Sequence, residues 1–384
     1  MTDIALPRPD RTAGAPSTAA YQLSDRYTRD DGRVFLSGVQ ALARLPLEQM
    51  RVDRRNGLRT AAFVCGYPGS PLAGFDKEAD AAARLAGDYA YVHTPGLNEE
   101  LAATAVMGSQ LAAERADCRH DGIIGFWYGK TPGVDRASDA LRHAVFAGVH
   151  RHSGAVAFVG DDAAAKSSTL PSSSDATLIG MHMPIITPGD VQETLDLGRH
   201  AIAVSRVSGL WAALKIAAPV ADGTGTIDLG LDRVTTGIPR GFAGDAGDHG
   251  RRYVAHADGY LLTPHTLELE KELFEVRLEL AREYGAASRL NEITVDPPDA
   301  WIGLAACGHT YYELRHALRL LGLRTNEQVA SAGVRLLHVR MPSPVDGAVL
   351  RRFGTGLAEI MVVEDKNPTL ELLLKDALYS AAQR

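Results

Sequence analysis

Two adjacent carboxylates, Glu99 and Glu100, stand at the start of a segment whose other side chains are mostly small. The segment, "HTPGLNEELAATAVMGSQLAAE", covers residues 93–114 and is rich in alanine, glycine and serine. One explanation of the pair is capping, because the free N–H groups and the dipole at a helix start favour negative charge. The other is chemistry. A helix with such small side chains packs closely against another backbone, and burial there favours the protonated, hydrogen-bond-donating form of a carboxyl group.

Two loops combine glycine and proline with polar side chains. "CGYPGSPLAGFD", residues 65–76, follows an apolar run, and loops at the carboxyl edge of an open α/β sheet bind ligands. Its glycines have neither dinucleotide-binding nor P-loop spacing, so Ser70 is equally well explained as a helix N-cap. "GDDAAAKSSTLPSSSD", residues 160–175, places Lys166 beside Ser167 and Ser168. This stretch is typical of a solvated loop, and it is also suited to bind a carboxylate or a partner's loop.

Other catalytic signatures are missing from the sequence. The polar stretch "YGKTPGVDRASDALRHA", residues 128–144, is explained by ordinary helix capping. There is no HExxH, no GxSxG nucleophile elbow and no carboxylate–histidine cluster at metal-ligand spacing, which argues against a hydrolase or a metalloenzyme formed by this chain alone. The three cysteines, Cys65, Cys118 and Cys307, are too few for a cysteine-held iron–sulfur cluster and are typical of a reducing compartment.

The composition indicates a globular protein with a sizeable core. The chain has 384 residues, of which 45% are hydrophobic. Its net charge of −7, with both signs interspersed, argues against nucleic acid or an anionic membrane as the main partner. No apolar run reaches the roughly 18 residues of a membrane span, and residues 1–20 lack the pattern of a signal peptide. We therefore expect a cytoplasmic protein with no membrane association.

Short apolar runs that alternate with helical patterns predict the fold class. Such alternation is typical of an α/β protein with a parallel sheet covered on both faces. A first helix is expected from about residue 34, ended or kinked at Pro46. The expected strands of the larger sheet lie in "LRTAAFVCG", "YAYVHT", "DGIIGFWYGK", "GAVAFVG", "MPIIT" and "LWAALKIAAPV". A second α/β pattern begins near Ala300 with the strand "AWIGLAACG".

These patterns divide the chain into four parts. Residues 1–24 are expected to be a disordered tail, and residues 25–225 a larger α/β domain. Residues 226–297 form a connecting region with a long charged helix, and residues 298–384 a smaller α/β domain.

Several of these stretches together resemble one enzyme family. "GYPGSP" is similar to the "GYPITP" loop of the 2-oxoacid:ferredoxin oxidoreductases, and "NEELAATAVMGS" to their Asn-Glu helix. The interval of nine residues from Glu99 to Gly108 matches that helix better than an interval counted from Glu100. "YGKTPGVDRASDALRHAVFAG" and "GDDAAAKSSTLPSSSD" resemble the indolepyruvate branch, as the amino-terminal portion of its long fused form. "HVRMPSPVD" and "IMVVEDKNPTLE" resemble its transketolase C-terminal-like domain.

The resemblance implies that the complete enzyme oxidatively decarboxylates an arylpyruvate such as indolepyruvate, with CoA and ferredoxin. It also implies roles for individual residues. The family uses thiamine diphosphate, and residues 25–225 correspond to its pyrimidine-binding domain. Glu99 is implied as the glutamate that activates the aminopyrimidine and Asn98 as the residue that orients it. The resemblance also places Tyr67 and Pro68 in the cofactor site. Four residues are implied near the substrate: Ser70, Lys166, Ser167 and Ser168.

The resemblance also implies partners, because family parts are missing here. "AGDAGDHG" is a poor match to the Gly-Asp-Gly motif that binds the diphosphate, and no Mg²⁺ site follows it. Thiamine diphosphate and Mg²⁺ would then be shared with a diphosphate-binding domain or subunit, and a [4Fe–4S] cluster would lie only in partner domains. CoA, ferredoxin, a 2-oxoacid such as indolepyruvate and a second copy of the chain complete the implied set. The chain would be either truncated or a separate subunit.

Two other functions remain open from the sequence. The chain could be a non-catalytic homologue that acts as a binding or assembly subunit. It could also be an unrelated nucleotide-binding α/β protein. Cofactor-dependent turnover with a partner would distinguish the first alternative, and tight nucleotide binding would favour the second.

Overall fold

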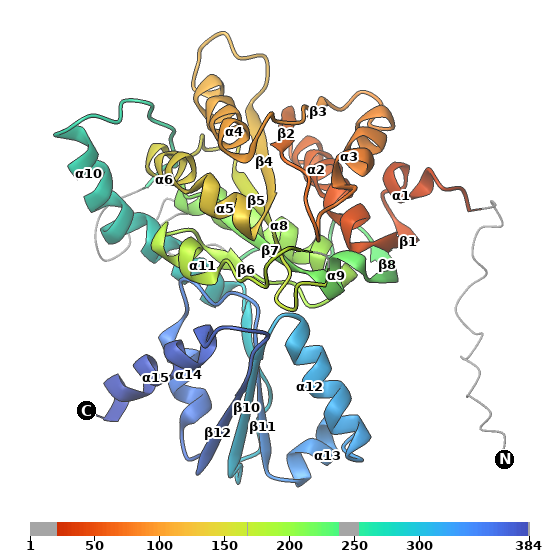
Figure 1. Ribbon diagram of the computed structural model, residues 1–384, viewed down its shortest axis with the longest axis vertical. Helices are drawn as coiled ribbons and strands as arrows, with labels where there is room; N and C mark the ends of the chain where they lie inside the picture. Colours follow the sequence, from red (N-terminus) through yellow and green to blue (C-terminus); the bar gives the residue numbers. More distant parts are fainter. Residues whose placement is uncertain (1–20, 167, 238–252, 383–384) are drawn as a thin grey trace.

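The computed structural model describes residues 21–166, 168–237 and 253–382 (Figure 1). The predicted tail falls almost entirely outside these residues, and so does Ser167. The described part begins with α1 (Asp25–Thr28). No helix in the described ranges is long and apolar enough to cross a membrane.

A six-stranded parallel sheet forms the centre of the upper part in Figure 1. Its strand order is β3-β2-β4-β5-β7-β6, and all neighbouring pairs are parallel. Most residues of β2, β4, β5 and β7 are buried, as expected for strands covered on both faces. The strands are β2 (Thr60–Gly66), β3 (Tyr91–His93), β4 (Gly122–Lys130), β5 (Ala155–Asp161), β6 (Ile185–Ile186) and β7 (Ala212–Ala217). This sheet confirms the predicted fold class.

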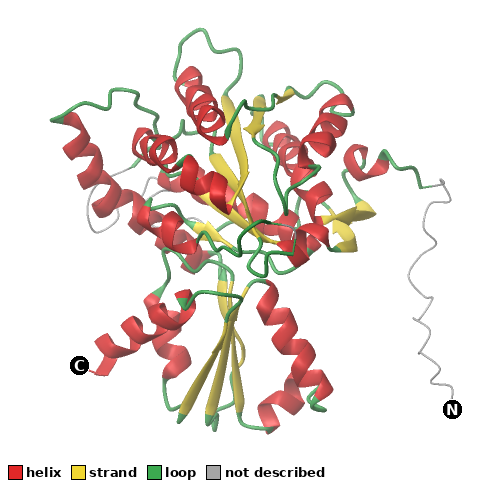
Figure 2. Ribbon diagram, in the orientation of Figure 1, coloured by secondary structure: helices red, strands yellow, loops and turns green. Residues whose placement is uncertain are grey.

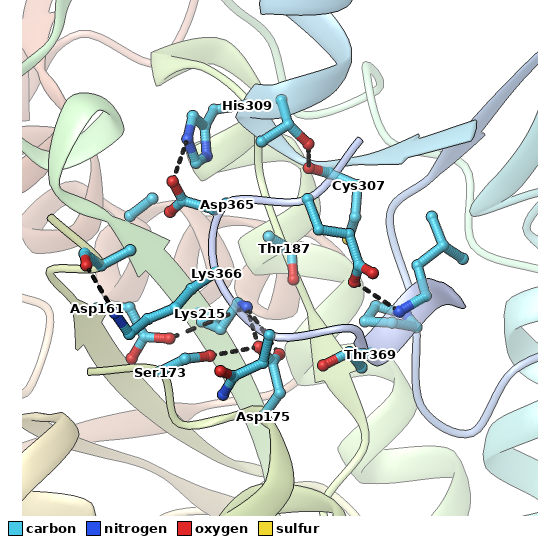
Figure 3. A pocket seen from close by; sticks show the side chains of 17 residues that line it. Asp161, Ser173, Asp175, Thr187, Lys215, Cys307, His309, Asp365, Lys366 and Thr369 are labelled. Carbon is cyan, nitrogen blue, oxygen red and sulfur yellow. Dashed lines mark hydrogen bonds and ion pairs between the residues drawn. The ribbon is translucent and has the colours of Figure 1, made fainter. Parts of the chain in front are cut away.

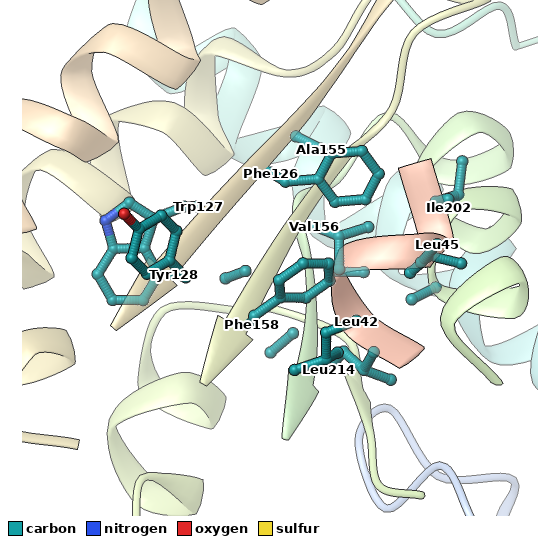
Figure 4. Close-up of a cluster of buried hydrophobic side chains, with 14 of the residues drawn as sticks. Leu42, Leu45, Phe126, Trp127, Tyr128, Ala155, Val156, Phe158, Ile202 and Leu214 are labelled. Carbon is teal, nitrogen blue, oxygen red and sulfur yellow. The ribbon is translucent and has the colours of Figure 1, made fainter. Parts of the chain in front are cut away.

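Helices cover the sheet on both faces (Figure 2). On one face α2 packs against α3 and α8, and the aromatic core formed by Phe126 and Phe158 lies with Leu42 of α2 (Figure 4). Successive side chains of a strand alternate between faces, so Trp127 belongs to the opposite face, where α4 packs against α6. The helices are α2 (Gly38–Arg55), α3 (Phe75–Arg84), α4 (Glu99–Ala113), α5 (Thr131–Arg136), α6 (Ser138–Ala147), α7 (Asp175–Gly180), α8 (Val191–Ser208) and α9 (Ala218–Asp222).

The first long helix corrects two expectations. It begins at Gly38 rather than near residue 34, and Pro46 does not end it, because α2 continues to Arg55. A proline inside a helix removes one backbone donor, but this helix begins with a capping box between Ser37 and Gln40 and is buried along most of its length. Packing therefore outweighs the local cost of the proline.

A second sheet forms the lower part of the molecule. Its strand order is β12-β10-β11-β9, with β10 (Ile302–Cys307) parallel to β11 (Val334–Val339) and β12 (Glu359–Val363). The antiparallel edge strand β9 (Asn291–Val295) lies in the range assigned from sequence to the connecting region. The second sheet therefore starts earlier than the sequence pattern indicated. Its helices are α12 (His309–Leu320), α13 (Asn326–Ser331), α14 (Gly347–Gly354) and α15 (Thr369–Ala382).

The remaining elements are a strand pair and a long helix. The antiparallel pair of β1 (Gly32–Ser37) and β8 (Thr224–Leu229) lies at the side of the larger sheet. The predicted charged helix is observed as α10 (His265–Glu272), a π-helical turn (Leu273–Arg277) and α11 (Leu278–Ala287). The buried Arg277 donates to the carbonyl oxygens of Val145 (2.7 Å) and Gly209 (2.5 Å), which fixes this helix to the larger domain.

Candidate active site

The strand order of the larger sheet reverses at its carboxyl edge. The chain runs from β2 outward to β3 and then crosses to β4 on the other side. Open α/β sheets bind ligands in a crevice at such a reversal, and we refer to this edge of the sheet as the crevice. The loops after β2, β3 and β4 meet there. They carry Tyr67, Pro68 and Ser70, then Asn98 and Glu99, and then α5.

The two carboxylates at the start of α4 occupy different environments. Glu99 is only 7% exposed, whereas Glu100 is exposed. Successive helix residues point about 100° apart, so burying one leaves its neighbour in solvent. Asn98 is the N-cap of α4, and its side chain accepts a hydrogen bond from the amide of Leu101 at 2.8 Å. This bond fixes the backbone from which Glu99 projects.

Three residues from the segment around α5 surround Glu99. Trp127 donates from Nε1 to the carbonyl oxygen of Glu99 at 2.9 Å. A Cβ atom at Gly133 would lie 2.7 Å from Glu99 Cγ, so the absence of a side chain there makes room for the carboxyl group. Arg136 approaches Glu99 with a long Nε–Oε2 distance of 3.9 Å. The sequence analysis explained residues 128–144 by capping and by family resemblance. It gave no role to Gly133 or Trp127, because their role depends on a contact between distant segments.

The loop after β2 is held by backbone contacts with its neighbours. The amide of Tyr67 donates to the carbonyl oxygen of Tyr128 at 3.0 Å, and the amide of Gly96 donates to the carbonyl oxygen of Gly66 at 2.8 Å. Tyr67 and Pro68 are exposed at the crevice. Ser70 is not the N-cap of α3, because that helix begins at Phe75 after Gly74. The left-handed φ of +87° at Gly74 explains why a glycine takes that position.

The serine-rich loop after β5 reaches the same crevice. The Asp162 carboxylate accepts hydrogen bonds from the amides of Lys166 and Ser168, both at 2.8 Å. Ser168 donates from Oγ to the carbonyl oxygen of Ser70 at 3.3 Å, so the structure brings these two predicted residues together. Lys166 is directed elsewhere: its side chain is 64% exposed, and Nζ pairs with Asp222 at 2.7 Å. This hydrogen bond to Asp222 raises the pKa of Lys166.

A charged cluster connects this loop to the second domain (Figure 3). Lys215 Nζ lies 2.7 Å from both carboxylate oxygens of Asp175 and 3.9 Å from Asp161. Burial opposes the charge of Lys215, but the two carboxylates outweigh it and raise its pKa. Burial also raises the pKa of Asp161, and Lys215 partly offsets this. From the second domain, Lys366 donates to the carbonyl oxygen of Ala163 at 3.2 Å.

The hollow inside this cluster is small. Its volume is about 50 Å³, enough for one or two water molecules rather than a substrate. Glu364 lines it and accepts hydrogen bonds from the amides of Leu370 (2.6 Å) and Glu371 (3.1 Å) at the start of α15. The cluster therefore joins the domains and anchors the serine-rich loop.

No group of residues in the described ranges has the composition of a metal site. The stretch "AGDAGDHG", residues 243–250, lies outside the described residues.

Comparison with known proteins finds relatives that match most of the chain. Residues 292–384 match the family model described as the indolepyruvate oxidoreductase domain. The chain is 27% identical over 344 residues to the indolepyruvate oxidoreductase subunit IorA of Pyrococcus abyssi, covering 89% of this chain and 47% of that protein. It is 26% identical to IorA of Archaeoglobus fulgidus, covering 88% and 48%. Along most of its length the chain is therefore similar to indolepyruvate oxidoreductase subunits. It spans about half the length of these IorA relatives.

A solved structure shows the same fold. The 2-oxoglutarate:ferredoxin oxidoreductase from Magnetococcus marinus superposes with a TM-score of 0.62 at 15% identity. The superposition covers 89% of this chain and 60% of the other. Because both domains take part in it, the two-domain α/β arrangement is confirmed.

Proposed function

We propose that the chain is a component of a thiamine diphosphate-dependent oxidoreductase. The complete enzyme would oxidatively decarboxylate an arylpyruvate such as indolepyruvate, with CoA and ferredoxin. The observation that carries the proposal is the burial of the Glu99 carboxyl group at the crevice where the strand order reverses. The kinship with IorA subunits supports the reaction class.

The residues present are compatible with the pyrimidine half of the cofactor. Within the ranges that the structure describes, the Glu99 carboxylate accepts no hydrogen bond, and Arg136 is its one ion-pair partner. A carboxyl group that is desolvated but lacks a donor is suited to bond with a ligand's ring nitrogen. When bound, thiamine diphosphate supplies the carbanion chemistry. The chain's part is to place the Glu99 carboxyl group beside the cofactor and to fix its position through Asn98, Trp127 and Gly133.

Other residues at the crevice are suited to the oxoacid. Ser70 and Ser168 come from separate loops and meet at its edge. Arg136 is 59% exposed beside Glu99, and a guanidinium is a good bidentate partner for a substrate carboxylate. Lys166 lies at the side, paired with Asp222, and would contact a partner domain more readily than the substrate. Tyr67 and Pro68 would border the cofactor.

A partner would complete the enzyme. We propose that a diphosphate-binding domain or subunit supplies the Mg²⁺ and diphosphate contacts, that [4Fe–4S] clusters lie in partner domains, and that the chain pairs with a second copy. The test is to mix the chain with the diphosphate-binding part of the enzyme and to measure CoA-dependent ferredoxin reduction with indolepyruvate. Turnover that requires both the chain and thiamine diphosphate would support the proposal. A folded assembly that is inactive under all conditions would favour a non-catalytic assembly subunit.

A further inference from the structure

A line of three hydrogen-bonded side chains lies behind the crevice. His93 Nδ1 is 2.7 Å from Asp80 Oδ1, and His93 Nε2 is 3.1 Å from the hydroxyl of Tyr128. The three residues come from α3, the end of β3 and β4. The His93 side chain is only 1% exposed, and Tyr128 is fully buried. Neither His93 nor Tyr128 was singled out by the sequence.

The proton positions follow from the partners. Burial, and to a smaller degree nearby Asp76, raise the pKa of Tyr128, so its phenol keeps its proton. The Asp80 carboxylate can only accept, which places the proton of a neutral imidazole on Nδ1. Nε2 of His93 then accepts from the Tyr128 hydroxyl. With this tautomer, both hydrogen bonds of the line join one donor to one acceptor.

Tyr128 is in contact with the loop that forms one wall of the crevice. A Cβ atom at Gly66 would lie 2.4 Å from the Tyr128 ring, so the ring lies directly against the start of that loop. The backbone carbonyl of Tyr128 accepts the amide of Tyr67. His93 itself begins the segment that leads to Glu99, and Thr94 and Gly96 in that segment donate to the backbone of β2. Fixing the Tyr128 ring therefore fixes both segments.

We propose that Asp80, His93 and Tyr128 form a positioning network that holds the Tyr67–Ser70 loop in place relative to Glu99. In this proposal the network acts through the loop and not by contact with a ligand. It acts by keeping the loop in one conformation, because a side chain locked by a hydrogen bond restrains the backbone packed against it. The kinetic part of this inference rests on the proposed function, whereas the structural part does not.

The test compares Tyr128→Phe with Tyr91→Phe. Each substitution removes one buried hydroxyl and little else, so both variants should fold. Tyr91 is a close control because its hydroxyl lies near the same residues but donates to the carbonyl oxygen of Ala43 in α2, at 3.2 Å, rather than to a member of the network. In the full chain, hydrogen exchange should speed up in peptides covering residues 66–71 and 94–98 of Tyr128→Phe. The expected increase is about 2- to 10-fold, corresponding to one net hydrogen bond.

Kinetics of the complete assembly separate positioning from a general loss of folded enzyme. If the competent loop conformation becomes less populated, apparent affinity falls by the same fraction. The KM for the 2-oxoacid should therefore rise about 2- to 10-fold in Tyr128→Phe, with kcat per folded enzyme little changed. A smaller folded fraction would lower the rate without raising KM. Gln at position 93 can still donate and accept hydrogen bonds, so KM should rise less in His93→Gln than in His93→Ala.

The outcomes distinguish this inference from the proposed function. If Tyr128→Phe and Tyr91→Phe give the same exchange and the same KM, the positioning network is wrong. If exchange rises only in Tyr128→Phe but the unmodified assembly never turns over, the network is supported and the proposed function fails. If Glu99→Gln abolishes turnover while Tyr128→Phe matches wild type in both measurements, the function stands and the network is overturned.

Discussion

Replacing Glu99 by Gln should abolish most turnover while leaving the fold almost unchanged. Gln preserves the size of the side chain, and the hydrogen bond from Trp127 reaches the backbone oxygen of residue 99, which the substitution retains. The ion pair lost is long, at 3.9 Å, and its Arg136 partner is largely exposed. Such pairs contribute about 0–1 kcal/mol, and the lost helix-dipole interaction about 0.3–1 kcal/mol.

The catalytic effect should be much larger than the effect on stability. A positioned general acid contributes about 10²–10⁴-fold in rate, which corresponds to roughly 3–5.5 kcal/mol in the barrier. Glu100→Gln is the matched control, because Glu100 is adjacent, carries the same charge near the same helix start, and is exposed. It should lose a similar few tenths to 1 kcal/mol of stability and keep its activity.

The assay pairs turnover of the complete assembly with melting curves of both variants. Small and equal effects of the two substitutions on turnover would mean that the carboxylates only cap α4. Loss of activity in Glu100→Gln with activity retained in Glu99→Gln would show that the assignment is one residue out of register.

Four other predictions concern Gly133, His200, iron content and cofactor binding. Gly133→Ala should displace the Glu99 side chain, because the new Cβ would lie 2.7 Å from Glu99 Cγ. We expect about 1–3 kcal/mol of destabilisation and a loss of turnover. At the control position Gly108 nothing lies within 4 Å of an added Cβ, so Gly108→Ala should stabilise the chain by about 0.5–1 kcal/mol. Burial lowers the pKa of His200 from 6.5 to about 4, so between these pH values the unfolded chain binds more protons than the folded chain. The free energy of unfolding should therefore fall as pH drops from 6.5 toward 4, by up to about 1.4 kcal/mol per pH unit. Urea titrations of wild type and His200→Gln at pH 7 and pH 5 measure this loss, and an equal loss of stability in both proteins would contradict the prediction. The isolated chain should contain no iron–sulfur cluster, since three cysteines cannot supply four thiolates, and about four irons per chain would overturn this. The isolated chain should also bind thiamine diphosphate weakly when measured by calorimetry, and sub-micromolar binding would overturn this.

The sequence by itself determined the architecture and the location of the crevice. Strands buried on both faces must be apolar throughout, so β2, β4, β5 and β7 were visible as continuous runs such as "TAAFVCG". The alternation with helices then required a parallel sheet. Its carboxyl edge had to carry the loops that begin at Tyr67 and end at Glu99. Local sequence rules predicted the roles of single residues less well. Helix α2 continues past Pro46 because its packing outweighs the cost of the proline, and the residue before α3 is Gly74, not Ser70.

The tertiary structure decided which of the candidate residues meet. Nothing local distinguishes Glu99 from Glu100, because only the packing of α4 against β4 and α5 makes one buried and the other exposed. Gly133 acquires its role from a side chain of another helix, and His93 from partners on α3 and β4. Lys166 and Ser168 are two residues apart in the sequence, and both of their amides donate to Asp162. Their side chains nevertheless have different partners, Asp222 and the carbonyl oxygen of Ser70. Periodicity reports how each segment faces the core, whereas a site consists of contacts between segments that are far apart in the chain, and those contacts form only when the whole fold is packed.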